Sequence, residues 1–113
     1  MGSDPMLTEQ DFRIAADRAL AQALRALLPL ADQEGFDVEL QNGVLQIVFE
    51  HPVKATFVVS PNAPARQIWV SAMSRSYKLS WTADRSAFTL DGGDTLAALL
   101  ERLALNYIGG PMR

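Results

Sequence analysis

Apolar residues recur at helical spacing along the first part of the chain. With about 100° between successive residues, one stripe of such a helix carries Phe12, Ala16, Ala19, Ala23, Leu27 and Leu30. Thr8 followed by Asp11 has the spacing of a capping box at a helix start, and Pro29 with the polar residues before Gly35 indicates the helix end. The pattern therefore predicts one amphipathic helix over residues 7–30.

The apolar spacing then changes from that of a helix to that of a strand. Residues 36–50 form two alternating runs joined by Asn42 and Gly43, a pair that favours the positive φ angles of a tight hairpin turn. Further alternating runs occupy residues 53–60, 66–72, 77–82 and 86–90. Residues 95–108 return to helical spacing, and Gly109 with Gly110 predicts the end of this second helix.

These elements predict an α+β fold. The loops between strands are too short for parallel crossovers, so we expect an antiparallel meander of five or six strands. One face of this sheet would be apolar, lined by Val38, Leu40, Leu45, Ile47, Phe49, Ala55, Phe57, Val59, Ile68, Val70, Tyr77, Leu79 and Trp81. The N- and C-terminal helices can cover that face, which gives a two-layer α/β sandwich in a single domain over residues 7–110. Residues 1–6 are interpreted as a tag or disordered start.

The other face of the predicted sheet is polar, and no element remains to cover it. It carries Asp37, Glu39, Gln41, Gln46, Glu50, Thr56, Ser60, Gln67, Trp69, Ser71, Lys78 and Ser80. Trp69 is the one large apolar residue on this otherwise polar face. An exposed tryptophan is typical of a binding anchor, but Trp69 could equally lie flat on cross-strand neighbours such as Lys78 or Thr56. Periodicity leaves both interpretations open.

Composition narrows the classes of function. The chain has 113 residues, no cysteine and a formal charge of −3, which argues against disulfides, thiolate chemistry and a nucleic-acid footprint. No apolar run approaches the length of a membrane span, and the first residues lack the pattern of a signal peptide. We therefore expect a cytoplasmic protein that binds neither membranes nor nucleic acid.

An enzymatic role has little support in the sequence. His51 is the only histidine, and it stands in a predicted turn without a partner for nucleophilic catalysis. Gly92 and Gly93 lack the spacing and the lysine of a phosphate-binding loop. We expect a non-enzymatic protein.

Carboxylates are the candidate metal ligands. They stand on the first helix, in the segment after it and on the first strand: Glu9, Asp11, Asp17, Asp32, Glu34, Asp37 and Glu39. Hard cations such as Fe²⁺ or Mg²⁺ select clustered oxygen ligands. The alternative is that these side chains only solvate the surface.

Two motifs together with the element order resemble the frataxin family, including its bacterial CyaY-type members. The first is the stretch NAPARQIWVS at residues 62–71, followed by YKLSW at 77–81, and the second is the Phe-x-x-x-Ala-Asp of residues 12–17. The resemblance runs nearly collinearly from residue 12 to residue 107. It implies a protein that binds iron weakly through an acidic ridge and docks through its sheet on the cysteine desulfurase and scaffold complex, regulating iron–sulfur cluster assembly.

The resemblance also implies roles for single residues. Gln67 and Trp69 match partner-binding positions of the sheet, with Ser71 alongside, and Asn62 matches a polar position in the preceding loop. The acidic ridge is thinned, because the late first helix has Leu24, Arg25, Leu28, Pro29 and Ala31 where family members concentrate acids. We expect Leu24 and Leu28 to form an apolar patch that either contacts a partner or packs under the loop at residues 30–36.

The sequence therefore predicts a monomeric, non-enzymatic iron–sulfur cluster assembly factor. In this interpretation the sheet face contacts the desulfurase and scaffold, and the seven carboxylates offer a weak iron site. One alternative is a small acidic chaperone-like adaptor that binds protein without metal, forms obligate dimers and has no affinity for the desulfurase. A ferroxidase that uses the carboxylates is a third possibility.

Overall fold

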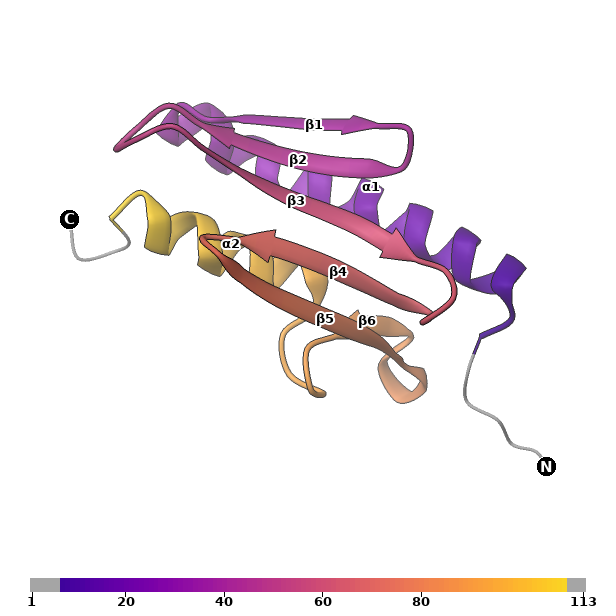
Figure 1. The fold of residues 1–113 in the computed structure, drawn as a ribbon. Coiled ribbons are helices and arrows are strands. Elements are labelled where there is room, and N and C mark those ends of the chain that lie inside the picture. The colour runs from indigo at the N-terminus through magenta and orange to yellow at the C-terminus, as the bar shows by residue number, and fades with distance from the viewer. Residues whose placement is uncertain (1–6, 110–113) are drawn as a thin grey trace.

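A computed structural model describes residues 7–109 as two helices on one face of a six-stranded antiparallel sheet (Figure 1). The strands follow chain order across the sheet, so the predicted meander and the α+β sandwich are confirmed. The predicted tag segment lies outside the described residues. Within them, no helix has the length and apolar character needed to cross a membrane.

Helix α1 spans Glu9–Glu34 and crosses behind the sheet. Thr8 caps its first turn, because its hydroxyl accepts a hydrogen bond from the Asp11 amide at 3.0 Å. The predicted end near Pro29 is wrong. The helix continues until Gly35, whose left-handed backbone (φ 81°) lets its N–H bond the Ala31 carbonyl at 2.8 Å.

The apolar stripe of α1 was predicted correctly at four positions of six. Phe12, Ala16, Ala23 and Leu27 are buried, but Ala19 and Leu30 are only half-buried, and their places in the core are taken by Leu20 and Ala31. These buried residues are spaced three or four apart throughout, as the 3.6-residue turn requires. The buried stripe continues past Pro29 to Ala31, and burial of this last turn stabilises the helix beyond the proline.

The sheet begins with the predicted hairpin. Strands β1 (Asp37–Gln41) and β2 (Val44–Phe49) join at Asn42 and Gly43, whose φ angles are 54° and 76°. The other strands are β3 (Ala55–Asn62), β4 (Gln67–Ala72), β5 (Arg75–Thr82) and β6 (Ala87–Thr89), with a short 3₁₀ turn at Ala83–Arg85. Strand β5 starts two residues before the predicted position, because Met73 and Ser74 make a tight turn with φ angles of 53° and 65°.

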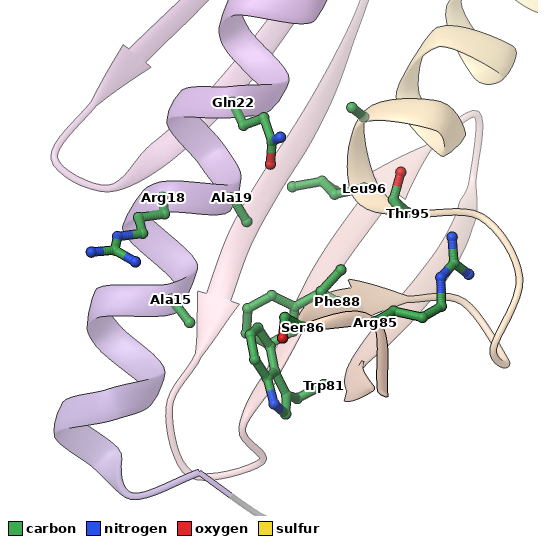
Figure 2. A pocket seen from close by; sticks show the side chains of 12 residues that line it. Ala15, Arg18, Ala19, Gln22, Trp81, Arg85, Ser86, Phe88, Thr95 and Leu96 are labelled. Atoms are coloured by element: carbon green, nitrogen blue, oxygen red, sulfur yellow. The ribbon is translucent and has the colours of Figure 1, made fainter. Parts of the chain in front are cut away.

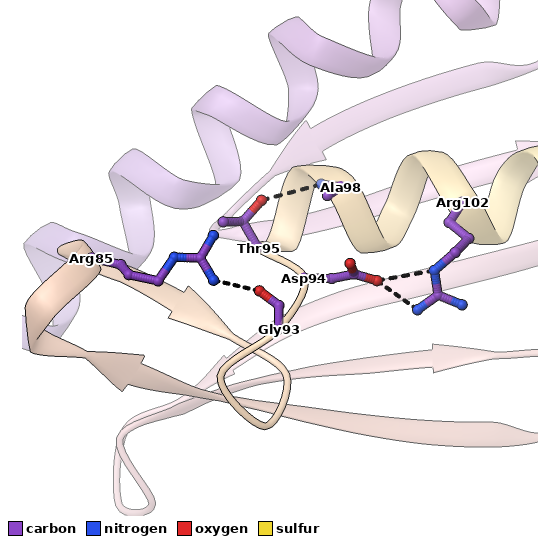
Figure 3. Close-up of polar contacts among 6 residues, drawn as sticks. All are labelled: Arg85, Gly93, Asp94, Thr95, Ala98 and Arg102. Atoms are coloured by element: carbon purple, nitrogen blue, oxygen red, sulfur yellow. Dashed lines mark hydrogen bonds and ion pairs between the residues drawn. The ribbon is translucent and has the colours of Figure 1, made fainter.

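Helix α2 (Leu96–Tyr107) packs beside α1 on the same face of the sheet. The loop before it is tied by side chains (Figure 3). Arg85 donates to the Gly93 carbonyl at 2.6 Å, Arg102 makes two hydrogen bonds to Asp94, and Thr95 accepts from the Ala98 amide at 3.4 Å. These contacts fix where α2 begins.

The core fills the space between the helices and the inner sheet face. Leu45, Ile47, Phe57, Val59, Ile68 and Leu79 are fully buried there, as the alternation of the strands predicts. Phe49 contacts three other rings, with centroid distances of 4.9 Å to Phe36, 4.9 Å to Phe57 and 4.8 Å to Tyr107. The helices leave the opposite face of the sheet uncovered (Figure 1).

Candidate functional site

Trp69 lies in the middle of β4 on the uncovered face. Its cross-strand partners are Ser60 on β3 and Lys78 on β5, and 37% of its surface is exposed. Alternation of the strand directs its neighbours Ile68 and Val70 into the core, which fixes the tryptophan on the outer face. The residue is therefore presented by a rigid element of the fold.

Side-chain contacts hold the Trp69 ring in place. Its indole N–H donates to Gln67 Oε1 at 3.0 Å, and the amide of Gln67 donates in turn to Ser80 Oγ at 3.1 Å. The Lys78 ammonium lies 4.8 Å from the ring centroid, within the range of a cation–π interaction. We call Gln67, Trp69, Ser71, Lys78 and Ser80 the tryptophan patch.

The patch combines the two interpretations that periodicity left open. Trp69 does pack on Lys78, as the packing interpretation expects, yet more than a third of it stays exposed. The expected neighbour Thr56 is wrong, because Thr56 pairs with Val48 and the β3 residue opposite Trp69 is Ser60. An aromatic side chain that is exposed and already ordered loses little conformational entropy on binding.

Asn62 and Gln67 serve the local structure as well as the surface. The Asn62 Oδ1 atom accepts from the Ala65 amide at 2.9 Å and so shapes the loop between β3 and β4. Arg66 braces the same loop, because it donates to the carbonyls of Leu7 and Ala63. The sequence pattern placed Ser80 on this face but did not indicate its hydrogen bond to Gln67. Only the register of β4 and β5, in which the two residues are directly opposite, indicates that bond.

The seven candidate metal ligands do not come together at one point. Asp11 and Asp32 are separated by about 30 Å along α1, given a rise of 1.5 Å per residue. Within residues 7–109, no group of three or more Asp, Glu, His or Cys side chains is arranged to hold a metal ion. The structure thus offers scattered carboxylates: Asp17 and Asp32 exposed on α1, Glu34 at its end, and Asp37 with Glu39 on the outer face of β1.

Glu9 is committed to an ion pair. Arg13 donates to its carboxylate at 2.8 Å one helical turn away, and this hydrogen bond together with the positive charge lowers the pKa of Glu9. Because the pKa falls on folding, any stabilisation is present above the ordinary carboxyl pKa and is lost as the pH drops through the lowered value. Both side chains are exposed, so the effect on stability is small.

Leu24 and Leu28 behave differently from each other. Leu24 is half-buried against the core, whereas Leu28 is 47% exposed. Leu28 lines a groove of about 890 Å³ with Gly35 and Phe36, which belong to the segment between α1 and β1. Of the two leucines predicted to form an exposed apolar patch, only Leu28 is exposed, and Leu24 packs partly buried against the core.

A second cavity of about 560 Å³ lies between α1, the end of β5, β6 and the start of α2 (Figure 2). Its wall includes Phe88 and Leu96, which are core residues, and Trp81, which is half-buried. The Arg85 side chain is turned toward the loop before α2, where it bonds two carbonyls, and Arg18 extends away from the cavity. The two cations on its wall therefore do not converge on a ligand position.

Comparison with known proteins places this geometry in a family. A sequence profile of the frataxin-like domain matches residues 5–110. The chain belongs to the frataxin-like family. The match covers both helices and all six strands, and the resemblance seen in the sequence is confirmed.

Curated relatives lie in the CyaY branch of this family. The chain is 31% identical over 97 residues to the iron-sulfur cluster assembly protein CyaY of Cupriavidus metallidurans, covering 84% of this chain and 86% of that protein. It is 32% identical over 100 residues to the protein of the same name from Janthinobacterium sp., covering 87% and 88%. The CyaY protein of Ectopseudomonas mendocina is 30% identical over 109 residues, 94% of each chain.

Proposed function

We propose that this frataxin-like protein takes part in iron–sulfur cluster assembly as a non-catalytic regulator that docks through the tryptophan patch. The names of its relatives, which are iron-sulfur cluster assembly proteins, support the process. The ordered and exposed Trp69 carries the docking part of the proposal. Its partner in this proposal is the complex of a cysteine desulfurase with its scaffold protein.

The physical argument rests on preorganisation. Aromatic anchors contribute a large share of interface energy when they are buried by a partner, and Trp69 needs no rearrangement to be covered. The neighbouring Lys78 places a positive charge beside Trp69, whereas Asp37 and Glu39 make the β1 end of the same face acidic. A partner that covers the whole face should therefore carry the opposite charge order.

The docking proposal is tested by substitution of the anchor. Trp69→Ala should weaken binding to a purified desulfurase–scaffold complex at least tenfold, because truncation of a central aromatic anchor costs about 2 kcal/mol or more. The measurement is the dissociation constant by calorimetry. Met73→Ala is the matched control, because Met73 is 59% exposed but lies in the turn after β4, outside the patch. Unchanged binding of Trp69→Ala would remove the tryptophan patch as the docking surface.

Weak iron binding is the second part of the proposal. The carboxylates are spread along α1 and β1, so Fe²⁺ would be held by one or two carboxylates at a time and not in a closed cage. Titration with Fe²⁺ under anaerobic conditions should therefore broaden amide signals near residues 9–39 only at high metal excess. In the double variant Asp37→Asn, Glu39→Gln, the broadening of amide signals near these two residues of β1 should be lost. A titration of the unchanged protein that leaves all signals near residues 9–39 unaffected would end this part of the proposal.

A further inference from the structure

Strand β1 is an open edge of the sheet. Within residues 7–109 it pairs only with β2, and no helix or strand of this part of the chain lies along its outer side in Figure 1. The opposite edge is protected, because β6 has three residues and is followed by a bridge between Thr89 and Thr95. In an antiparallel edge strand, alternate N–H and C=O groups point away from the sheet and can pair with an added strand.

An apolar groove runs beside this edge. It has a volume of about 890 Å³ and lies between the last turns of α1 and the start of β1, lined in part by Leu28, Pro29, Phe36 and Val38. Leu28 is exposed and Val38 half-buried, so both present apolar surface to a side chain entering from the edge. An added strand would direct alternate side chains into this groove and the others to the outer face.

Charge at the edge is unbalanced. Asp37 and Glu39 lie on the outer face of β1, and within the described chain neither makes a hydrogen bond or ion pair. Asp32 and Arg25 stand on the groove wall, which leaves three carboxylates against one cation. The edge thus offers acceptors and negative charge.

We propose that β1 accepts an extended segment of another protein by strand addition, with lysine or arginine at the positions that face outward and apolar residues at the positions that face the groove. Opposite charges directly across two strands stabilise the pairing, and the groove selects the apolar positions. An acidic surface alone would bind any basic segment, whereas this site requires alternating basic and apolar residues and backbone hydrogen bonds to β1. It lies at the sheet edge, away from Trp69 at the centre of the outer face.

A second copy of this chain does not meet these requirements. Antiparallel pairing of two β1 strands over all five residues places Glu39 opposite Glu39 of the other copy, and the register shifted by two residues, which keeps the same faces together, places Asp37 opposite Glu39. Like charges directly opposite destabilise a strand pair. The edge therefore disfavours its own copy and favours a basic segment.

The first experiment uses the whole chain and a synthetic peptide that alternates lysine and valine. Amide signals of residues 36–41 and of Leu28 should shift on titration. A peptide of the same composition with its lysines and valines in two blocks should bind at least threefold more weakly, and one alternating glutamate and valine should not bind. Equal binding of the block peptide, shifts mapping elsewhere, or dimerisation of the chain without peptide by sedimentation would overturn the proposal.

Variants test both halves of the site. Glu39→Lys should weaken the lysine–valine peptide by roughly three- to tenfold and gain binding to the glutamate–valine peptide, since one cross-strand charge pair is reversed. Leu28→Ser should weaken binding roughly two- to fivefold, because the peptide can then bury less apolar side-chain surface in the groove. The controls are Asp84→Lys, an exposed acid on the 3₁₀ turn, and Ile14→Ser, which is 48% exposed on α1 but outside the groove.

Backbone pairing is tested with peptides methylated on alternate backbone nitrogens. A strand pairs through only one of its two edges, so one of the two methylated isomers should bind like the parent peptide and the other should lose binding. If both bind equally, the contact is electrostatic only and strand addition is wrong. None of these measurements involves the desulfurase, so their outcome is independent of the docking proposal.

Discussion

At the scale of single residues, the most informative side chain is Gln67. Its oxygen accepts from Trp69 and its amide donates to Ser80, so it links two strands and orients the exposed ring. The exposed tryptophan is thus positioned by a residue whose side-chain oxygen and nitrogen both already make hydrogen bonds. We infer that Gln67 acts on docking chiefly through Trp69.

Substitution of Gln67 tests this division of roles. Gln67→Leu removes the acceptor of the indole N–H, so the Trp69 Nε1–H signal should shift upfield and its ring should become more mobile. The cost in the free energy of unfolding should stay near 1 kcal/mol, because the bond is exposed. The Trp81 indole signal is the internal control, since that ring packs against Phe88 on the inner face. An unchanged Trp69 signal would show that Gln67 does not orient the ring.

At the scale of elements, the sequence predicted strands better than their ends. Alternation placed the strands correctly because the inner residues are buried and the outer ones face water, as at Ile68 and Trp69. The β4–β5 connection was predicted two residues too long, because Met73 and Ser74 adopt positive φ angles without the Gly or Asn that signals a two-residue turn. The α1 end was misplaced because burial of Ala31 outweighs the local preference of Pro29 to end a helix.

Gly35 gives a direct test of how α1 ends. Gly35→Ala should reduce the free energy of unfolding by about 1 kcal/mol, because the left-handed conformation is strained for alanine although an added Cβ would meet nothing within 4 Å. Chemical denaturation measures this loss. Gln33→Ala, at an exposed position in the last turn of the same helix, should change stability by less than about 0.5 kcal/mol. Equal effects of the two substitutions would contradict the capping role.

The candidate site was predictable in position but not in contacts. Period-two alternation put Trp69 and Gln67 on the uncovered face, whereas the hydrogen bond between them depends on rotamers that no sequence pattern specifies. The carboxylates were predictable as a group, but their separation along a 26-residue helix prevents the convergence that a metal site requires. The groove beside Leu28 was not predictable, because it is formed by the last turns of α1, which the sequence pattern did not assign to the helix.

At the scale of the whole molecule, the ring cluster around Phe49 joins distant parts of the chain. Phe36 directly precedes β1, Phe57 belongs to β3 and Tyr107 ends α2. The Tyr107 hydroxyl also donates to the Val53 carbonyl at 2.5 Å. The last turn of α2 is therefore held to the sheet by packing and to the loop between β2 and β3 by a hydrogen bond. Loss of this cluster should loosen α2 from the sheet.

Phe49→Ala should cost about 3–5 kcal/mol in the free energy of unfolding, because it leaves a cavity in a fully buried position. That is a large part of the 5–15 kcal/mol typical of a domain. Thermal and denaturant unfolding measure the loss, and Val53→Ala, at a 66% exposed position, is the control with little expected change. A loss below about 1 kcal/mol would show that the cluster does not hold the two layers together.

The two tryptophans lie on opposite faces of the same sheet, Trp69 toward solvent and Trp81 against Phe88. Each layer of the molecule therefore carries its own optical reporter. With Trp81→Phe, the remaining fluorescence comes from the outer face that a partner would cover; with Trp69→Phe, it comes from a half-buried ring on the inner face, whose packing against Phe88 is lost on unfolding. Association and unfolding of this protein can thus be followed as separate signals, without any label attached to the chain.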